Sequence, residues 1–305
     1  MKAYLILDCS YLIYRAWHST QHNEQLKNNE GKRTNAVYGF VNAIHTIHGV
    51  FKRKHKFEDI YVLPCFDSSS KNHERTSILD SYKSGRKMPE GLGHQFAMCK
   101  EACKTLGLET FIHDEYEADD IIVTFAKQLE SVCDPDAGDK VFIVSCDKDM
   151  YQVLSETIWS YLPQKNTFVK PEDVLKRYGV YPKHMTMYQA MVGDSCDSIK
   201  GIGGIGPKSA PLIIKDKFPE DYPTFKEEIA DNQTICKKLE KLKLKFSTLQ
   251  EPYETNLLLV TLCTEVPMEM DPEALVPLKN DAFHSEDWKE MCSLTFVKPT
   301  KVAST

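Results

Sequence analysis

Nine acidic residues of this chain have a spacing that would let them share divalent cations. Carboxylate oxygens suit Mg²⁺ and Mn²⁺, and Mg²⁺ usually keeps several waters while taking one or two carboxylates directly. Nine acids exceed the needs of one ion. Two ions about 3.5 to 4 Å apart, which clamp the attacking and leaving oxygens of a phosphodiester, would use such a set. The nine acids are Asp8, Asp67, Glu117, Asp119, Asp120, Asp147, Asp149, Asp194 and Asp197.

Short apolar segments place three of these acids at the ends of predicted buried strands. Residues 4–7, 60–66 and 141–146 are rich in β-branched and aromatic side chains, and Asp8, Asp67 and Asp147 follow them directly. Ligands of open α/β sheets bind beyond the carboxyl ends of the strands, so we expect these three aspartates to converge. A single aspartate after a strand is more often a turn residue. Three of them, joined by six further acids, would repel one another severely without cations, which favours a metal site.

The other acids form pairs that could aim two carboxylates at one point: Glu117 and Asp120, Asp147 and Asp149, and Asp194 and Asp197. The first and third pairs would share a face of a helix, and the second would share a face of a strand that stays extended. For any one pair, a helix cap or a salt bridge is the more ordinary explanation, because a carboxylate near a helix N-terminus is stabilised by ~0.3 to 1 kcal/mol. The metal prediction therefore rests on the whole set.

A glycine-rich segment at residues 201–206 satisfies the G-x-G-x-x-G pattern of dinucleotide-binding folds. That fingerprint needs a preceding strand, which residues 194–200 do not resemble, so we reject the nucleotide interpretation. A glycine-rich turn that enters a helix still presents backbone N–H groups to an anion, here a DNA phosphate. A plain turn between two helices remains the alternative. The predicted DNA contacts in this segment are Lys200, Gly201, Gly203, Gly204, Gly206, Lys208 and Ser209.

A basic segment at residues 68–94 is rich in Ser, Lys, Asn, Arg and Gly and poor in apolar residues. We expect it to be a mobile excursion above the sheet. Its cations could neutralise a phosphate during in-line attack, and Tyr82 could stack on a base. Alone it would be an ordinary solvated loop, but its position directly after Asp67 favours a functional role. The predicted DNA-contacting residues are Arg75, Tyr82, Lys83 and Arg86.

The wider pattern predicts a doubly wound α/β sheet over residues 1 to about 170, with helices at 36–50, at 96–106 and from residue 118, followed by short helices from Pro171. The net charge of −6 is unusual for a protein that binds nucleic acid, yet the acids concentrate in the predicted site. The ten cysteines lack zinc spacing and are expected to be reduced. No apolar stretch reaches the ~20 residues of a membrane span, and no signal-peptide pattern is present, which predicts a cytoplasmic protein.

Together these motifs resemble the structure-specific 5′ nucleases, the flap endonuclease and 5′-3′ exonuclease group that includes phage enzymes and the N-terminal nuclease region of bacterial DNA polymerase I. The matching segments lie in the family's order and cover most of the first 215 residues. They are residues 7–8, 66–67, 82–86, 116–120, 145–149, 193–197 and 201–208, and residues 259–262 resemble the family's later helical portion.

The resemblance implies a doubly wound, mostly parallel PIN-like nuclease core at residues 1–170, with a helical arch at about 68–95. It implies a helical DNA-binding region at residues 171–305, with a helix-three-turn-helix at about 185–218. Lys83 and Arg86 would contact the scissile phosphate, and the glycine segment would also cage K⁺. The catalytic ion would be held by Asp67, Glu117, Asp119 and Asp120 with outer support from Asp8, and a second cluster would be Asp147, Asp149, Asp194 and Asp197.

The predicted function is a monomeric, stand-alone hydrolase that uses two Mg²⁺ or Mn²⁺ ions to cut DNA at 5′ flaps, nicks and free 5′ ends, with RNA–DNA hybrids as further substrates. Replication or repair in a bacterial cell or a phage-infected host is the expected context. The residues expected to carry catalysis are Lys83, Arg86, Asp67 and Asp120. The alternatives are a PIN-type ribonuclease and a non-catalytic junction-binding protein. Two departures from the family pattern are Glu74, at a commonly apolar position of the arch, and Pro211, in the helix that follows the glycine segment.

Overall fold

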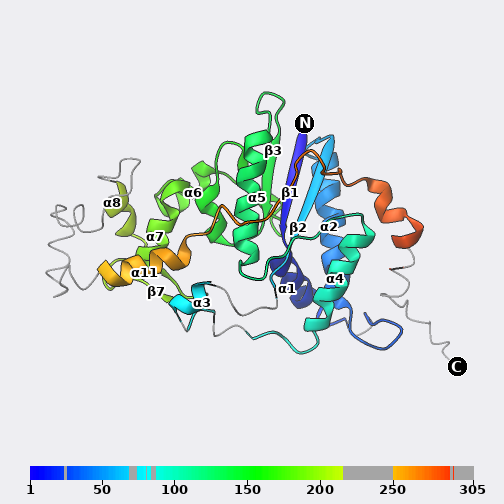
Figure 1. Cartoon of the computed structure of the whole chain (residues 1–305), viewed down its shortest axis with the longest axis horizontal. Helices are drawn as coiled ribbons and strands as arrows, with labels where there is room; N and C mark the ends of the chain where they lie inside the picture. The colour runs from blue at the N-terminus through cyan, green and yellow to red at the C-terminus, as the bar shows by residue number, and fades with distance from the viewer. Residues whose placement is uncertain are drawn as a thin grey trace.

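A five-stranded sheet in the order β2-β1-β3-β4-β5 forms the centre of the molecule (Figure 1). The computed structural model describes residues 1–23, 26–68, 74–79, 81–83, 87–215, 250–288 and 291. Strands β1 to β4 run parallel to one another, and β5 runs antiparallel to β4. The strands are β1 (Lys2–Asp8), β2 (Asp59–Cys65), β3 (Lys140–Val144), β4 (Ile158–Leu162) and β5 (Thr167–Val169).

Strand β1 shows why both faces of the sheet are covered. Its side chains alternate between the two faces, as the two-residue period of a strand requires. Tyr4 and Ile6 belong to one buried apolar cluster, whereas Ala3, Leu5 and Leu7 belong to the other. A strand that is buried on both sides reads in sequence as a continuous apolar run, which is the pattern that predicted it.

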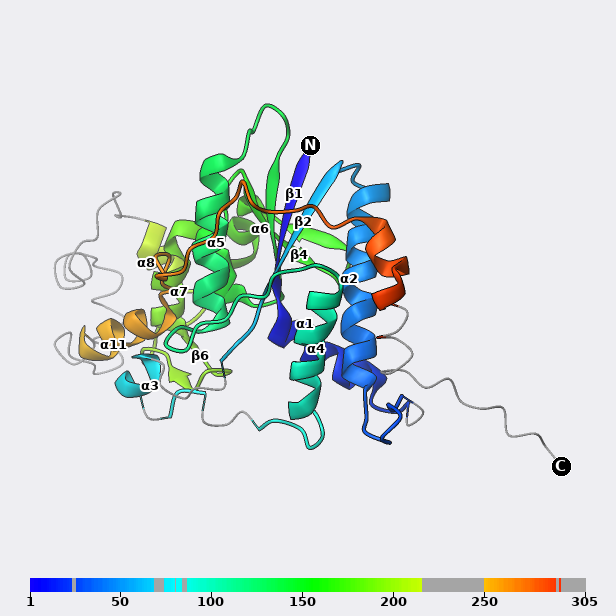
Figure 2. The same cartoon turned by 45° about the vertical axis from the view of Figure 1, so that its right-hand side comes forward.

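Helices form a layer on each side of the sheet (Figures 1 and 2). On one side, α1 (Cys9–Thr20) and α4 (Gly93–Thr105) pack against α2 (Asn35–Arg53). On the other side, α5 (Ala118–Val132) packs on β1 and β3 and contributes six fully buried residues, among them Ile121, Ile122 and Phe125. The sequence prediction of a doubly wound, mostly parallel sheet is therefore confirmed.

A helical region lies beside α5, beyond the sheet (Figure 1). Its helix α7 packs against α8, η2 and α11, and a two-stranded antiparallel hairpin follows α7. The predicted helix-three-turn-helix range thus holds α7, the hairpin and α8, and Pro211 sits in the first turn of α8. The elements are η1 (Lys148–Val153), α6 (Pro171–Tyr178), η2 (Pro182–His184), α7 (Met185–Val192), β6 (Gly193–Asp194), β7 (Ile199–Lys200), α8 (Ala210–Lys215) and α11 (Gln250–Val260).

The segment after α11 returns across the molecule to the far helical layer (Figure 1). The backbone N–H of Leu278 donates to the carbonyl of Ile60 in edge strand β2 at 2.8 Å. Beyond it, Phe283 in η4 (Asn280–His284) joins the apolar cluster of α2. Of the predicted arch, the structure describes residue 68, the short helix α3 (Glu74–Ile78) and residues 79, 81–83 and 87 onward. Among the described residues, none of the helices combines the length and apolar character that a membrane span requires.

Candidate active site and metal centre

The three strand-end aspartates meet at the carboxyl edge of the sheet. Asp8 ends β1, whose register pairs it with Cys65 of β2, and Asp67 follows two residues later. Asp147 follows β3, the neighbour of β1 on its other side. Together with Asp119 these aspartates line one cleft of about 520 Å³. The predicted convergence is therefore present, because parallel neighbouring strands deliver their C-terminal residues to one edge.

Asp8 is held rigidly at the floor of this cleft. It caps α1, accepting a hydrogen bond from the Tyr11 backbone N–H at 2.9 Å, and it accepts another from the Ser145 hydroxyl at 2.7 Å. Burial, together with the charges of Asp67 and Asp147, raises the pKa of Asp8 to about 6, against the effect of these hydrogen bonds. A cation in the cleft would relieve the same unfavourable burial.

Asp67 ties the end of β2 to the start of α5. Its two carboxylate oxygens accept hydrogen bonds from the Ser10 hydroxyl at 2.6 Å and from the Ala118 backbone N–H at 3.0 Å. The side chain remains exposed on the cleft. Asp67 is thus oriented by its neighbours while each carboxylate oxygen retains lone pairs for a ligand.

Neighbouring acids at the start of α5 point in different directions. Asp119 lines the cleft, where burial and the charges of Asp147, Asp8 and Asp67 raise its pKa well above the ordinary value, despite the opposing effect of nearby Lys83. Asp120 is turned away and is only 2 % exposed. Of these two predicted ligands, Asp119 therefore lies in the cleft, whereas the carboxylate of Asp120 lies against Arg75.

Lys83 of the arch segment reaches the acids from above the sheet. Its ammonium nitrogen lies 2.8 Å from a Glu117 oxygen and 3.9 Å from an Asp119 oxygen. Its backbone N–H donates to the carbonyl of Asp197 at 3.3 Å. These carboxylates raise the pKa of Lys83 above its usual value although burial opposes them. Lys83 thus lines the same cleft as the strand-end aspartates, as an acidic cleft attracts a cation.

Tyr82 and Arg75 are placed differently from the sequence prediction. Tyr82 is 6 % exposed, belongs to the core, and donates its hydroxyl to Glu117 at 3.1 Å. Arg75 is 8 % exposed and is paired with Glu117 and Asp120. In this conformation neither side chain presents a surface to a base or a phosphate, because the apolar residues around the arch base and the acids of α5 enclose them. Arg86 lies outside the described residues.

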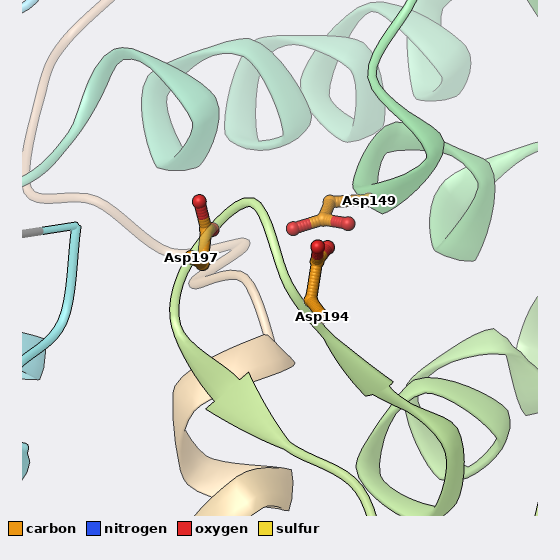
Figure 3. A group of neighbouring side chains, drawn as sticks. All are labelled: Asp149, Asp194 and Asp197. Atoms are coloured by element: carbon orange, nitrogen blue, oxygen red, sulfur yellow. The ribbon is translucent and has the colours of Figure 1, made fainter. Parts of the chain in front are cut away.

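A second acidic cluster is formed by Asp149, Asp194 and Asp197, which each offer a carboxylate oxygen within 4.8 Å of the others (Figure 3). The local structure differs from the sequence expectation. Asp149 lies in the 3₁₀ helix η1 rather than in an extended strand, because Asp147 caps this turn by accepting from the Asp149 N–H at 3.0 Å. Asp194 and Asp197 lie at the β6–β7 hairpin rather than on one helix.

The second cluster is buried among other acidic groups. Burial and the charges of Asp147, Asp194 and Asp197 raise the pKa of Asp149 to about 8. Among the described residues, the Lys148 ammonium lies 2.9 Å from an Asp194 oxygen. Asp147 contributes unfavourable charge to Asp8 and Asp119 as well as to Asp149, so it connects the two clusters electrostatically. Such all-oxygen donor sets fit hard divalent cations.

Close backbone packing requires glycine at one position of the glycine segment. A Cβ on Gly201 would lie 2.2 Å from the carbonyl oxygen of Val192, so no larger residue fits there. By contrast, a Cβ on Gly206 would meet nothing within 4 Å. The Gly206 N–H donates to the Ser209 hydroxyl at 2.9 Å, whereas Lys200 and Lys208 are exposed. The DNA roles of these residues, with Gly203 and Gly204, stay predictions.

Several residues around the clusters escaped the sequence analysis. The Ser10 hydroxyl orients Asp67, and the Ser145 hydroxyl orients Asp8. The sequence feature that could have indicated them is that each serine lies two residues from one of the nine acids. Gln189, which is 1 % exposed, donates its side-chain N–H to Asp149. Its signal was an amide side chain among the mostly apolar residues of helix α7. Asn256 of α11 was not foreseeable, because only the fold brings its amide to the carbonyls of Ala190 and Lys200.

Two family models match the chain: the 5′-3′ exonuclease N-terminal resolvase-like domain over residues 3–179, and the 5′-3′ exonuclease C-terminal SAM fold over residues 180–282. A 5′-3′ exonuclease of Aquifex aeolicus is 32% identical over 277 residues, which cover 90% of this chain and 86% of that protein. DNA polymerase I of Rhizobium leguminosarum is 32% identical over 89% of this chain, which spans only 25% of that polymerase.

Solved structures with the same fold come from bacteriophage T5. The T5 5′-exonuclease with bound zinc ions matches with a TM-score of 0.62 and 22% identity, covering 96% of this chain and 99% of that one. The T5 flap endonuclease in complex with DNA and metal ions matches with a TM-score of 0.60 and 21% identity, covering 86% and 90%. At these identities the likeness establishes the fold.

Proposed function

The chain belongs to the 5′-3′ exonuclease family, and on that premise we propose that it is a structure-specific nuclease that hydrolyses DNA phosphodiesters at 5′ flaps, nicks and free 5′ ends. One observation carries the proposal. Asp8, Asp67, Asp119 and Asp147 line a single cleft together with Lys83, and the second acidic cluster adjoins it through Asp147. Acids that bind cations suit phosphodiester hydrolysis. An ammonium beside them can contact the phosphate.

The two clusters support a site for two divalent cations, which we propose to be Mg²⁺ or Mn²⁺. When bound, such ions supply positive charge to the phosphate and activate a water for attack. Asp119 and Asp67 would hold one ion, with Asp8 and Asp147 close by, and Asp149, Asp194 and Asp197 would hold the other. The raised pKa values of Asp8, Asp119 and Asp149 support this, since their carboxylates are buried with insufficient compensating charge.

The remaining residues of the cleft would orient the acids and the substrate. Ser10 and Ser145 fix the carboxylates of Asp67 and Asp8 through hydrogen bonds, so that these need little reorganisation on binding. When DNA binds, the Lys83 ammonium would leave Glu117 and contact the scissile phosphate. Its positive charge would then stabilise the transition state. Exposed Lys200 and Lys208 beside the hairpin would contact the duplex backbone without reading sequence.

We extend the same proposal to the finer expectations from the sequence. These are a nuclease core at residues 1–170 with a DNA-binding helical region after it, K⁺ at the glycine segment, activity on RNA–DNA hybrids, a monomeric state, and a cytoplasmic role in replication or repair. The match to 86% of the Aquifex aeolicus 5′-3′ exonuclease supports the nuclease assignment. The match to the Rhizobium leguminosarum polymerase spans 25% of that protein.

A set of matched substrates tests the function. Single-turnover cleavage is measured on a 5′-flap duplex, the same duplex with a 3′ flap, a nicked duplex and single strands of DNA and RNA, each 5′-labelled. We expect cleavage near the junction of the 5′ flap and exonucleolytic products from the nick, with the 3′ flap uncut. Preference for single-stranded RNA would favour the ribonuclease alternative. Tight junction binding with no cleavage would favour the junction-binding alternative.

A further inference from the structure

Arg75 forms the most extensive set of side-chain contacts at the base of the arch. Its guanidinium donates to both carboxylate oxygens of Asp120, at 2.8 and 2.7 Å, and to Glu117 at 2.9 Å. It also donates to two backbone carbonyls at the end of α11, that of Leu259 in its last turn at 3.0 Å and that of Thr261 directly after it at 2.9 Å. The planar fork of Arg suits such bidentate and multiple contacts, whereas Lys is a point charge.

The partner Asp120 is saturated by this arrangement. One of its oxygens accepts from Arg75 and from the backbone N–H of Cys263 at 2.8 Å. The other accepts from Arg75 and from the backbone N–H of Glu117 at 3.2 Å. A carboxylate offers about four lone-pair positions, and all four are occupied. Asp120 therefore has no lone pair left for a cation, in contrast to Asp119 beside it, which faces the cleft.

We propose that Arg75 and Asp120 are a buried positioning pair that fastens the arch base and the segment after α11 to the start of α5, and thereby orients Glu117 for its contact with Lys83. Arg75 is then not a contact of DNA, and Asp120 is not a ligand of a metal ion. The inference rests on the proposed function and deepens it, because Arg75 and Asp120 would support catalysis by orienting Glu117.

The pair connects three parts of the chain that are distant in sequence. Arg75 comes from α3, Asp120 from α5, and Thr261 from the segment after α11, in which the Cys263 backbone N–H also donates to Asp120. Glu117 is the shared neighbour, since it accepts from Arg75, Tyr82 and Lys83. If Arg75 were displaced, Glu117 would lose one of its charge partners. The carboxylate of Asp120 would remain buried without the positive charge of the guanidinium.

Salt dependence of DNA binding separates this role from a phosphate contact. Binding of the 5′-flap duplex is measured in Ca²⁺ at several salt concentrations for Arg75→Gln and for Lys208→Gln, an exposed residue that serves as the positive control. A lost phosphate contact makes the slope of log affinity against log salt less negative by about 0.9. We expect that change for Lys208→Gln and an unchanged slope for Arg75→Gln. A slope that becomes less negative in Arg75→Gln, with unchanged thermal stability, would overturn the proposal.

Thermal unfolding tests the pair without any need for cleavage. Breaking a buried ion pair is expected to lower the melting temperature by roughly 10 °C in a chain of this size. Arg75→Gln and Asp120→Asn should each cause such a loss, and the double variant should lose less than the sum, because the second change removes a partner that is already stranded. Additive losses would contradict the pairing.

Arg75→Lys keeps the charge and tests the positioning role if Arg75→Gln folds poorly. The single-turnover cleavage rate at saturating DNA is measured well below the melting temperature of the variant. We expect a reduction on the order of 100-fold with flap affinity unchanged, since a small displacement of catalytic groups has that effect. Wild-type rate and stability in Arg75→Lys would refute the proposal. A wild-type protein that cleaves nothing would instead refute the proposed function, and the unfolding and salt measurements would still judge the pair.

Discussion

The ammonium nitrogen of Lys83 lies 2.8 Å from a carboxylate oxygen of Glu117, 34 residues further along the chain. Lys83 belongs to the segment above the sheet, and Glu117 is the N-cap residue of α5. Lys83 has a φ of 51°, a backbone conformation that costs about 1 to 2 kcal/mol for a residue other than glycine. Among the described arch residues, Lys83 and the exposed Lys87 line the cleft. The contact with Glu117 brings Lys83 into the acid cluster.

Removing the Lys83 ammonium should slow chemistry more than binding. For Lys83→Ala we expect single-turnover flap cleavage to fall by on the order of 100-fold or more, because a charge directed at the phosphate in a buried site is lost. Lys87→Ala is the matched control, since Lys87 lies four residues further along the same segment, lines the cleft and is exposed. Its rate should stay within about tenfold of the wild type. Equal rates for Lys83→Ala and the wild type would remove the catalytic role.

The stability of the metal-free protein should decrease as pH rises. The native pKa of Asp149 is raised by burial to about 8, from an ordinary value of 3.8. Between these values the folded protein holds a proton that the unfolded chain has released, so the free energy of unfolding falls with rising pH, by at most about 1.4 kcal/mol per unit for this group. Urea unfolding in EDTA between pH 5 and 8 measures the slope.

Asp149→Asn is the control for that slope, because asparagine cannot titrate. Its unfolding free energy should depend less steeply on pH than that of the wild type, and added Mn²⁺ should stabilise the wild type more at pH 8 than at pH 6, since carboxylate ligands must be deprotonated. Parallel pH profiles for the two proteins would show that burial does not raise the pKa of Asp149.

Two glycines of the hairpin segment should differ in their response to alanine. Gly201→Ala would force backbone apart, since its Cβ would lie 2.2 Å from the Val192 carbonyl oxygen, and an overpacked site typically costs about 1 to 3 kcal/mol. Gly206→Ala has open space and should change stability by less than about 0.5 kcal/mol. Chemical denaturation of both variants measures the difference. Equal destabilisation would mean that the close approach at Gly201 is not what requires glycine.

The sequence predicted those features of the fold that depend on local pattern. Apolar runs located β1, β2 and β3, and the rule for parallel sheets brought Asp8, Asp67 and Asp147 to one edge. Pro171 predicted the start of α6, where proline occupies the first turn. These predictions succeed because strand alternation and helix capping are set by neighbouring residues.

Features that depend on distant contacts could not be predicted. Asp119 and Asp120 are adjacent acids in sequence, but Asp119 lines the cleft whereas Asp120 is held away from it by contacts with Arg75 and Cys263. Tyr82 looked like a stacking residue, but the fold buries it against Glu117. The turn that holds Asp149 follows from its cap by Asp147, and the hairpin that holds Asp194 follows from its pairing with Ile199. The contacts of Asp120 and Tyr82 are tertiary, whereas the cap and the hairpin are local but leave no periodic signal.

Cleavage of a 5′-end-labelled flap duplex under single-turnover conditions, by the wild type and by Asp67→Asn, tests the central claim most directly. Asp67 is exposed on the cleft, so the substitution should leave the fold and flap binding nearly unchanged. With Mg²⁺ we expect wild-type cleavage near the junction, none with Ca²⁺ or EDTA, and a rate for Asp67→Asn lower by on the order of 100-fold or more. Cleavage by the wild type in EDTA, or an undiminished rate for Asp67→Asn, would contradict hydrolysis by this acidic centre.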